Sequence, residues 1–285
     1  MVNGSHSRSE KGRVISKEPV ILAAALVSVL VGGAPAAATG QSGRATGDSP
    51  DTQRVRQAAE KQDAAAQYEL GLAYVAGEGV PQDLAAAAGW LRKAAEQGYA
   101  KAQNDLGVMY EEGHGVPQDS AAAVTWWRKA AVQGLADAQN YLGVMYDNGS
   151  GVAQDPLQAL EWFRKAAEQG HAAAQNNLGL MYEIGRAVSL DYNQALKWYR
   201  KSADQGWAAA QASLGLMYVG AVGVAQDLVE ADVWFQIATL GATGDEQAKY
   251  DNLREAVETK MRVADIIEAR QRAREWLRTF ERRTR

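Results

Sequence analysis

Apolar residues recur three or four positions apart in two stretches of a unit that repeats along the chain. In the unit formed by residues 100–135, the first stretch contains Ala102, Leu106, Met109 and Tyr110. After a glycine-rich segment, a second stretch contains Ala123, Trp126, Trp127 and Ala130. This spacing places each set on one face of an α-helix. The pattern predicts a helix–loop–helix unit with apolar faces too wide for one pair of helices to bury alone.

The unit returns every 36 residues without insertion or deletion. An Ala-Gln-x-x-Leu-Gly motif places its glutamine at Gln67, Gln103, Gln139, Gln175 and Gln211. A tryptophan keeps the same period at Trp90, Trp126, Trp162, Trp198 and Trp234. A fixed period of this length indicates supersecondary units that stack on their neighbours. We therefore expect one elongated array whose function lies on a surface.

Two residue types indicate how each unit is built. Asp119 and its equivalents precede the second stretch, where an aspartate can accept a hydrogen bond from the first turn of a helix. Gly107 and its equivalents lie inside the first predicted helix, where glycine costs about 1 kcal/mol relative to alanine. We expect the partner helix to approach closely there, with the periodic tryptophan filling the space. Truncating one such tryptophan should then cost about 3 to 5 kcal/mol.

The two ends of the array differ from its centre. Residues 53–63 resemble a shortened second helix and predict an N-terminal capping helix. Residues 244–285 predict two C-terminal capping helices, the second rich in arginine. Because acidic residues alternate with these arginines, a solvated outer face is favoured over nucleic-acid binding.

The repeated motif, followed by Gly113, Gly115, Val116, Pro117 and Asp119, resembles the Sel1-like repeat, a relative of the tetratricopeptide repeat. The resemblance covers residues 64–243 as five repeats of 36 residues. It implies an all-α fold, a right-handed α-solenoid of helix-turn-helix units. The fourth repeat departs from the motif at Ala187 and Ser189, and the fifth carries Gly220 one position early, so we expect these two loops to differ in shape.

Residues 1–36 have the organisation of a signal peptide. Four basic residues precede an apolar stretch from Val20 to Val31, and small residues follow, with a cleavage site expected near Ala36 to Ala38. The apolar stretch is shorter than the roughly 20 residues that span a bilayer, which disfavours an uncleaved anchor. A periplasmic or secreted protein without integral membrane association is expected, with residues 37–52 as a flexible linker.

Composition narrows the chemistry. The net charge is −4, and removal of residues 1–36 makes it −6 because four basic and two acidic residues are lost. An acidic balance argues against a general affinity for nucleic acid. The absence of cysteine excludes thiolate nucleophiles and thiolate metal sites. The three histidines and the abundant acids form no recognised catalytic motif, so we expect no enzyme activity, no cofactor and no metal site.

The positions that vary between repeats share one face of the first helix and are free to contact a partner. By similarity to tetratricopeptide arrays, this face would line a concave groove. The predicted partner-binding residues are Tyr68, Leu72, Lys101, Asn104, Val108, Glu111, Asn140, Val144, Asp147, Asn176, Leu180 and Glu183. An asparagine row could hydrogen-bond an extended peptide backbone, and an acidic row would favour a basic segment. The alternative is that these asparagines are merely solvated.

These observations predict a non-catalytic exported scaffold that binds an envelope protein, or an extended peptide segment of one, through its concave face. By family resemblance, such a protein could regulate signalling or assemble complexes, although fold alone does not establish function. The oligomeric state is left open. The alternative is a glycan or cell-wall-fragment binder, for which Trp207 is the main candidate residue because it lies outside the tryptophan period. A hydrolase is the least favoured hypothesis.

Overall fold

The structure is a computed structural model that describes residues 48–284. Over this range it contains helices and no strand, as the all-α prediction requires. The helices are α2 (Pro50–Glu60), α3 (Ala64–Ala76), α4 (Leu84–Glu96), α5 (Ala100–Glu112), α6 (Ser120–Val132), α7 (Ala136–Asn148), α8 (Pro156–Glu168), α9 (Ala172–Ile184), α10 (Tyr192–Ala203), α11 (Ala208–Gly220), α12 (Leu228–Gly241), α13 (Gly244–Glu258) and α14 (Val263–Thr284). The predicted signal peptide lies outside the described residues.

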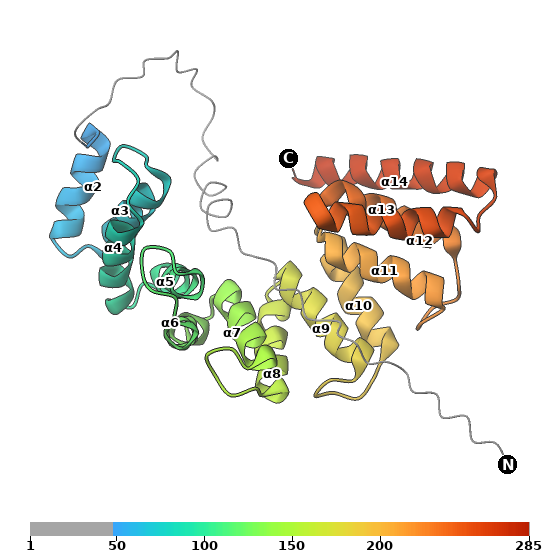
Figure 1. Ribbon diagram of the computed structural model, residues 1–285, viewed down its shortest axis with the longest axis horizontal. Helices are drawn as coiled ribbons and strands as arrows, with labels where there is room; N and C mark the ends of the chain where they lie inside the picture. The colour runs from blue at the N-terminus through green and yellow to red at the C-terminus, as the bar shows by residue number, and fades with distance from the viewer. Residues whose placement is uncertain (1–47, 285) are drawn as a thin grey trace.

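Consecutive helices pack against one another to form a curved solenoid (Figure 1). The five pairs from α3/α4 to α11/α12 are the five repeats. Helices α5 and α7 lie on the inner side of the curve, and α6 and α8 lie on its outer side. Helices α13 and α14 both pack on α12 and close the C-terminal end.

Each second helix begins at the periodic aspartate, as predicted. The side chains of Asp83, Asp119, Asp155, Asp191 and Asp227 all accept hydrogen bonds from amides of the following first turn. At the N-terminal end, α2 begins at Pro50, so the last residues of the predicted linker are helical. The cause is local: Ser49 accepts a hydrogen bond from the Thr52 amide, and Pro50 occupies the first turn.

The helical glycines allow close helix packing, but the periodic tryptophan is not the side chain that fills the space. A Cβ atom at Gly107 would lie 2.7 Å from Nε1 of Trp127, the residue that follows the periodic Trp126. The equivalent residues in the other repeats are Leu91, Phe163, Tyr199 and Phe235. They and Trp127 are at most 3% exposed. The prediction for the tryptophan was therefore wrong by one position.

The first four periodic tryptophans are half-buried, and each packs beneath a lysine three residues later. Lys129 Nζ lies 3.9 Å from the centroid of the Trp126 ring, and Lys93 Nζ lies 3.7 Å from that of Trp90. This cation–π geometry explains why the ring is retained at a position that the core does not cover. Trp234, in the fifth repeat, is instead buried.

The periodic glutamines bind successive repeats together. Gln103 donates from Nε2 to the carbonyl oxygen of Ala95 in the preceding repeat, at 3.0 Å. Its Oε1 accepts a hydrogen bond from Gln133 Nε2, at 2.7 Å. The same pair of bonds recurs at Gln67, Gln139 and Gln175, which gives both polar atoms of each buried amide a partner.

The loops of the fourth and fifth repeats keep the conformation of the others. Ala187 has φ 60°, where Gly115 has φ 69° and Gly151 has φ 65°. Ala221 has φ 53° and ends α11 in the left-handed conformation that Gly113 adopts at the end of α5. The prediction of differently shaped loops was wrong, because the packing of the array imposes the left-handed conformation even on alanine, at a local cost in strain.

Candidate partner-binding face

The predicted binding residues all lie on α3, α5, α7 and α9, the first helices of four successive repeats. The structure brings them together along one side of the array but buries many of them. Leu72, Val108 and Leu180 are 8%, 3% and 9% exposed and belong to the hydrophobic core. Val144 is half-buried against the same core. The apolar row therefore stabilises the stack and offers little surface to a partner.

The three asparagines are also buried. This burial favours neither the hypothesis that they are solvated nor the hypothesis that they are open to a peptide backbone. Asn104, Asn140 and Asn176 are 8%, 7% and 8% exposed. Asn140 Oδ1 accepts a hydrogen bond from Nδ2 of Asn177 in the next repeat, at 3.1 Å. Asn104 and Asn176 each retain a buried Oδ1 without a hydrogen-bond partner among the described residues. Little of each side chain is therefore available to a peptide backbone.

The acidic row is largely engaged within the protein. Asp147 is 2% exposed, and its Oδ1 lies 2.7 Å from Nε of Arg186 in the next repeat. Glu183 accepts a hydrogen bond from the Tyr199 hydroxyl at 2.6 Å. Glu111 is half-buried, and Lys101 is exposed. A partner would therefore meet fewer of these charges than the sequence suggests.

A neighbouring carboxylate, Asp105, is the most unusual group on this face. Its Oδ2 accepts a hydrogen bond from the Tyr68 hydroxyl and its Oδ1 accepts one from Asn104 Nδ2, both at 3.0 Å. Burial raises the pKa of Asp105, and the nearby Asp137 raises it further. Both hydrogen bonds and the charge of Lys101 oppose this shift of the pKa. Asp105 forms no ion pair within residues 48–284, so its charge is only partly compensated.

Tyr141 lies among three carboxylates on the same face. Its ring stacks on Trp127 with centroids 4.9 Å apart, which fixes its position. Burial raises the pKa of the Tyr141 hydroxyl, and the charges of Asp137, Asp105 and Glu112 raise it further. We call Asp105, Glu112, Asp137 and Tyr141 the acidic cluster.

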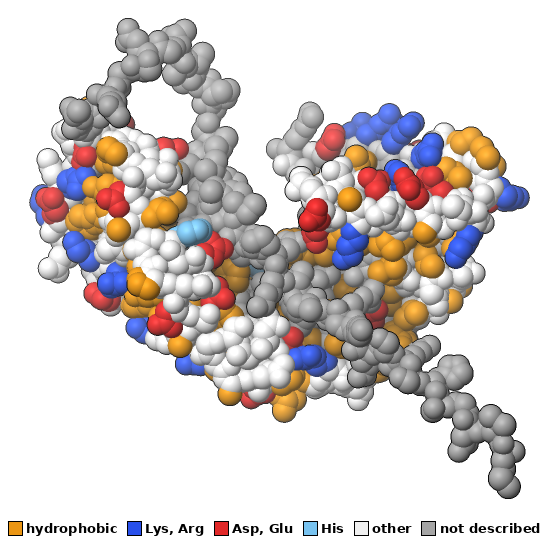
Figure 2. Space-filling view, in the orientation of Figure 1, with side chains coloured by type: hydrophobic (Ala, Val, Ile, Leu, Met, Phe, Trp, Pro, Cys, Tyr) orange, Lys and Arg blue, Asp and Glu red, His pale blue; other side chains and the backbone are white. Residues whose placement is uncertain are grey.

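Two histidines border the acidic cluster. His171 Nδ1 accepts a hydrogen bond from the Ala174 amide, so its Nε2 carries the proton and donates to Asp137 Oδ1, at 3.1 Å. This bond lowers the pKa of Asp137. His114 Nδ1 lies 3.0 Å from Glu112 Oε2, and burial raises the pKa of that carboxyl group. Figure 2 shows acidic side chains and a histidine gathered on the inner side of the curve.

The sequence contained a signal for this cluster. The position of Asp105 is occupied by Glu69, Tyr141, Asn177 and Ser213 in the other repeats. It therefore varies as much between repeats as the positions that were predicted to bind a partner. Its depth could not be predicted, because the rotation of one repeat on the next decides which residue lies in the crevice between first helices.

Other sites are not supported by the described residues. Between residues 48 and 284, no group of three or more histidine, cysteine or acidic residues is arranged to hold a metal ion. No helix in that range is long and apolar enough to cross a membrane. Trp207, the candidate for glycan binding, immediately precedes α11 and is half-buried against the core.

Stacked helix pairs that recur every 36 residues, most of them joined by interlocking glutamines, define an α-solenoid repeat protein. The profile of the Sel1 repeat matches residues 64–99, 100–135, 136–171, 172–207 and 208–240. The chain therefore belongs to the Sel1 repeat family. Proteins built from this repeat are generally non-catalytic scaffolds that bind other proteins.

Two solved structures show the same architecture. One is c5321, a protective antigen present in uropathogenic Escherichia coli strains, with 33% identity and a TM-score of 0.64 over 81% of this chain. The match covers 56% of c5321, so the chain spans little more than half of that relative. The other is a Sel1 repeat protein from Oxalobacter formigenes, with 28% identity, a TM-score of 0.67, and coverage of 82% of this chain and 97% of that one. A search of the curated proteins finds no significant match.

Proposed function

We propose that this protein is an exported, non-catalytic scaffold that binds a basic, extended segment of another envelope protein across the acidic cluster. The observation that carries the proposal is the partly desolvated carboxylate of Asp105, which has two neutral hydrogen-bond donors and, among residues 48–284, no cationic partner in an ion pair. A lysine or arginine from a partner would compensate this charge.

The surrounding groups suit such a partner. Asp137 remains accessible, with a side chain 58% exposed, and the side chain of Glu112 is 21% exposed. Tyr141 presents a ring held by Trp127, against which a guanidinium or an aliphatic stem can pack. Carboxylates arranged in this way increase the association rate and the specificity for a basic segment more than they increase raw affinity.

Binding can be measured with labelled ten-residue peptides in which lysine or glutamate alternates with alanine. We expect fluorescence anisotropy to show binding of the lysine peptide and not of the glutamate peptide. A variant with Asp137→Asn and Glu112→Gln removes two charges while keeping side-chain shape, and should bind roughly tenfold more weakly. The matched control, Glu161→Gln with Glu168→Gln, removes two exposed charges from α8.

Equal binding of both peptides, or an equal loss in the control, would refute recognition at the acidic cluster. Affinity capture from an envelope extract then identifies the partner. A captured protein supports the proposal when the lysine peptide displaces it and the cluster variant does not retain it.

Export is tested separately, by fusing residues 1–52 to alkaline phosphatase, an enzyme that is active only outside the cytoplasm. We expect activity from the fusion and its loss when Leu26→Arg interrupts the apolar stretch. N-terminal sequencing of the exported protein should place the cleavage near Ala36 to Ala38. Retention of the apolar stretch would support an anchor instead.

A further inference from the structure

Helix α2 is the second helix of an incomplete repeat. Val55 and Ala58 stand 36 residues before Leu91 and Ala94 of α4. After the helix, Gln62 has φ 67° at the position where Gly98 has φ 90°. The backbone thus follows the repeat closely, but within residues 48–284 no first helix precedes α2.

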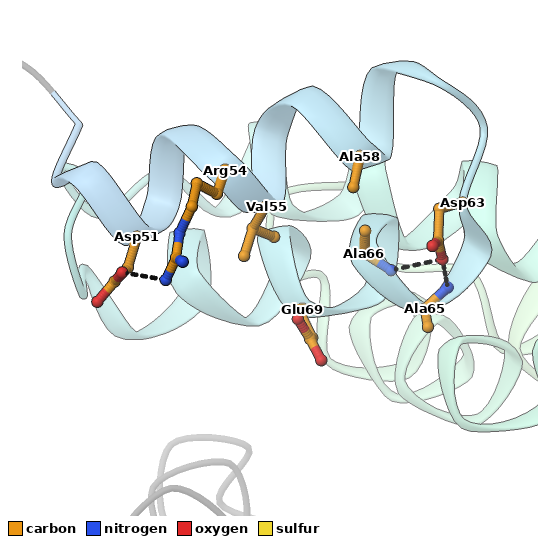
Figure 3. Close-up of a pocket in the computed structure, with 8 residues that line it drawn as sticks. All are labelled: Asp51, Arg54, Val55, Ala58, Asp63, Ala65, Ala66 and Glu69. Carbon is orange, nitrogen blue, oxygen red and sulfur yellow. Dashed lines mark hydrogen bonds and ion pairs between the residues drawn. The ribbon is translucent and has the colours of Figure 1, made fainter.

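Among the described residues, the face of α2 that a first helix covers in other repeats is therefore open. In α4, Ala87, Leu91 and Ala94 are at most 1% exposed because α3 packs on them. Their counterparts in α2 are Asp51, which is exposed, and Val55 and Ala58, which are half-buried. The open face and the start of α3 form a shallow hollow of about 420 Å³ (Figure 3).

The hollow has an apolar floor and an acidic rim. Val55, Ala58 and Ala66 supply the floor. Asp51, Asp63 and Glu69 stand around it, against one cationic residue, Arg54, which is paired with Asp51 at 2.5 Å. An aspartate has thus replaced the buried alanine of the complete repeats. A helix that docks here should combine apolar side chains with basic ones.

Helix α14, at the opposite end of the array, has such a face (Figure 1). Val263 and Ile267 are 74% and 56% exposed. Arg270, Arg274 and Arg278 continue the same stripe at helical spacing and are exposed. Arg274 and Arg278 form no ion pair within residues 48–284. Figure 2 shows basic side chains gathered over this helix.

We propose that a second copy of this chain occupies the hollow, with the stripe of α14 packed on the open face of α2. Arginines of α14 would meet the acidic rim, and Val263 and Ile267 would extend the apolar floor. The contact joins two different surfaces, so a pair of molecules retains one free hollow and one free α14. Copies would therefore add head to tail, continuing the solenoid, without using the acidic cluster.

Sedimentation velocity of the full chain over a wide concentration range tests this contact. We expect oligomers that grow with concentration and weaken at high salt. Glu69→Arg alters the hollow, and Arg274→Glu alters α14, so each should weaken association roughly tenfold or more. A matched control, Arg164→Glu on the exposed face of α8, should associate as the unmodified chain does.

Mixing the two variants gives the most specific result. The altered hollow of one variant matches the altered α14 of the other, and their unaltered surfaces also match, so the mixture should regain oligomers in which the two variants alternate. The double variant should again form longer oligomers. A monomer at all concentrations would overturn the proposal, as would association that persists in both single variants. Circular dichroism of each variant verifies folding, and peptide binding at the acidic cluster should be unchanged.

Discussion

The distinction between Trp126 and Trp127 gives the sharpest test of how each repeat is stabilised. Trp127 is 3% exposed, stacks on Tyr141, and donates from Nε1 to the carbonyl oxygen of Asn104 at 3.2 Å. Trp127→Ala leaves a large cavity against Gly107 and removes this hydrogen bond, so it should cost about 4 to 5 kcal/mol.

Trp126→Ala should cost much less. The ring is half-buried, and its lost contacts are part of its apolar area and the cation–π contact with Lys129. Together these amount to about 1 to 2 kcal/mol. The difference between adjacent tryptophans is therefore expected to be roughly 3 kcal/mol.

Urea unfolding followed by far-ultraviolet circular dichroism measures both variants. The slope of the free energy with urea must be compared as well, because a cavity within a repeat array can divide it into parts that unfold separately. Phe163→Ala and Trp162→Ala repeat the comparison one unit later. If truncating the periodic tryptophan destabilises the protein as much as truncating its buried neighbour in both units, our account of the packing is wrong.

Three further changes should alter stability, each measured by urea unfolding. Burial raises the pKa of Asp232 to about 6. The folded state then binds this proton more tightly than the unfolded state, so the cost of the charge is full above pH 6 and declines as the pH falls toward 4. Asp232→Asn should stabilise by about 1 to 2 kcal/mol at pH 8 and by less at pH 5, and an equal gain at both would contradict this. Among the described residues, the buried Oε1 of Gln211 lacks a hydrogen-bond partner because Gly241 stands where the other repeats have a glutamine. The free energy of unfolding of Gly241→Gln should exceed that of Gly241→Ala by about 1 kcal/mol, because the new glutamine can donate to Gln211 Oε1. Equal values would mean that this hydrogen bond does not form. Ala187→Gly and Ala221→Gly relieve left-handed alanines and should stabilise by up to about 1 kcal/mol, whereas a loss would show that the strain is negligible.

The fold could be predicted because its determinants are local and repeated. The aspartate caps and the helical glycines keep fixed positions in every unit. The periodic tryptophan was misassigned because the position whose residue type is constant is not the position that fills the space against glycine. The buried position is filled by a leucine, a tryptophan, phenylalanines or a tyrosine, since any large side chain fills the space against glycine. The periodic position keeps tryptophan in all five units, although it is half-buried in the first four.

The candidate site could be predicted as a face but not as a set of residues. Helical spacing identifies the side of the first helix that points away from its partner. It does not reveal that Asn140 and Asn177 meet across a repeat junction, or that Tyr68 reaches Asp105. Those contacts depend on the rotation between units, which no pattern within one unit contains.

The acidic cluster is more easily explained by binding than by folding. In a repeat array each unit contacts only its neighbours, so an unfavourable residue affects one junction and leaves the rest intact. Later repeats place the neutral Asn177 and Ser213 at the position of Asp105, which shows that the stack does not require a charge there. A carboxylate retained in a partly desolvated crevice has a stability cost. A cationic partner would offset that cost when bound, and this difference between free and bound states would give the inner face the preference for a basic segment that we propose.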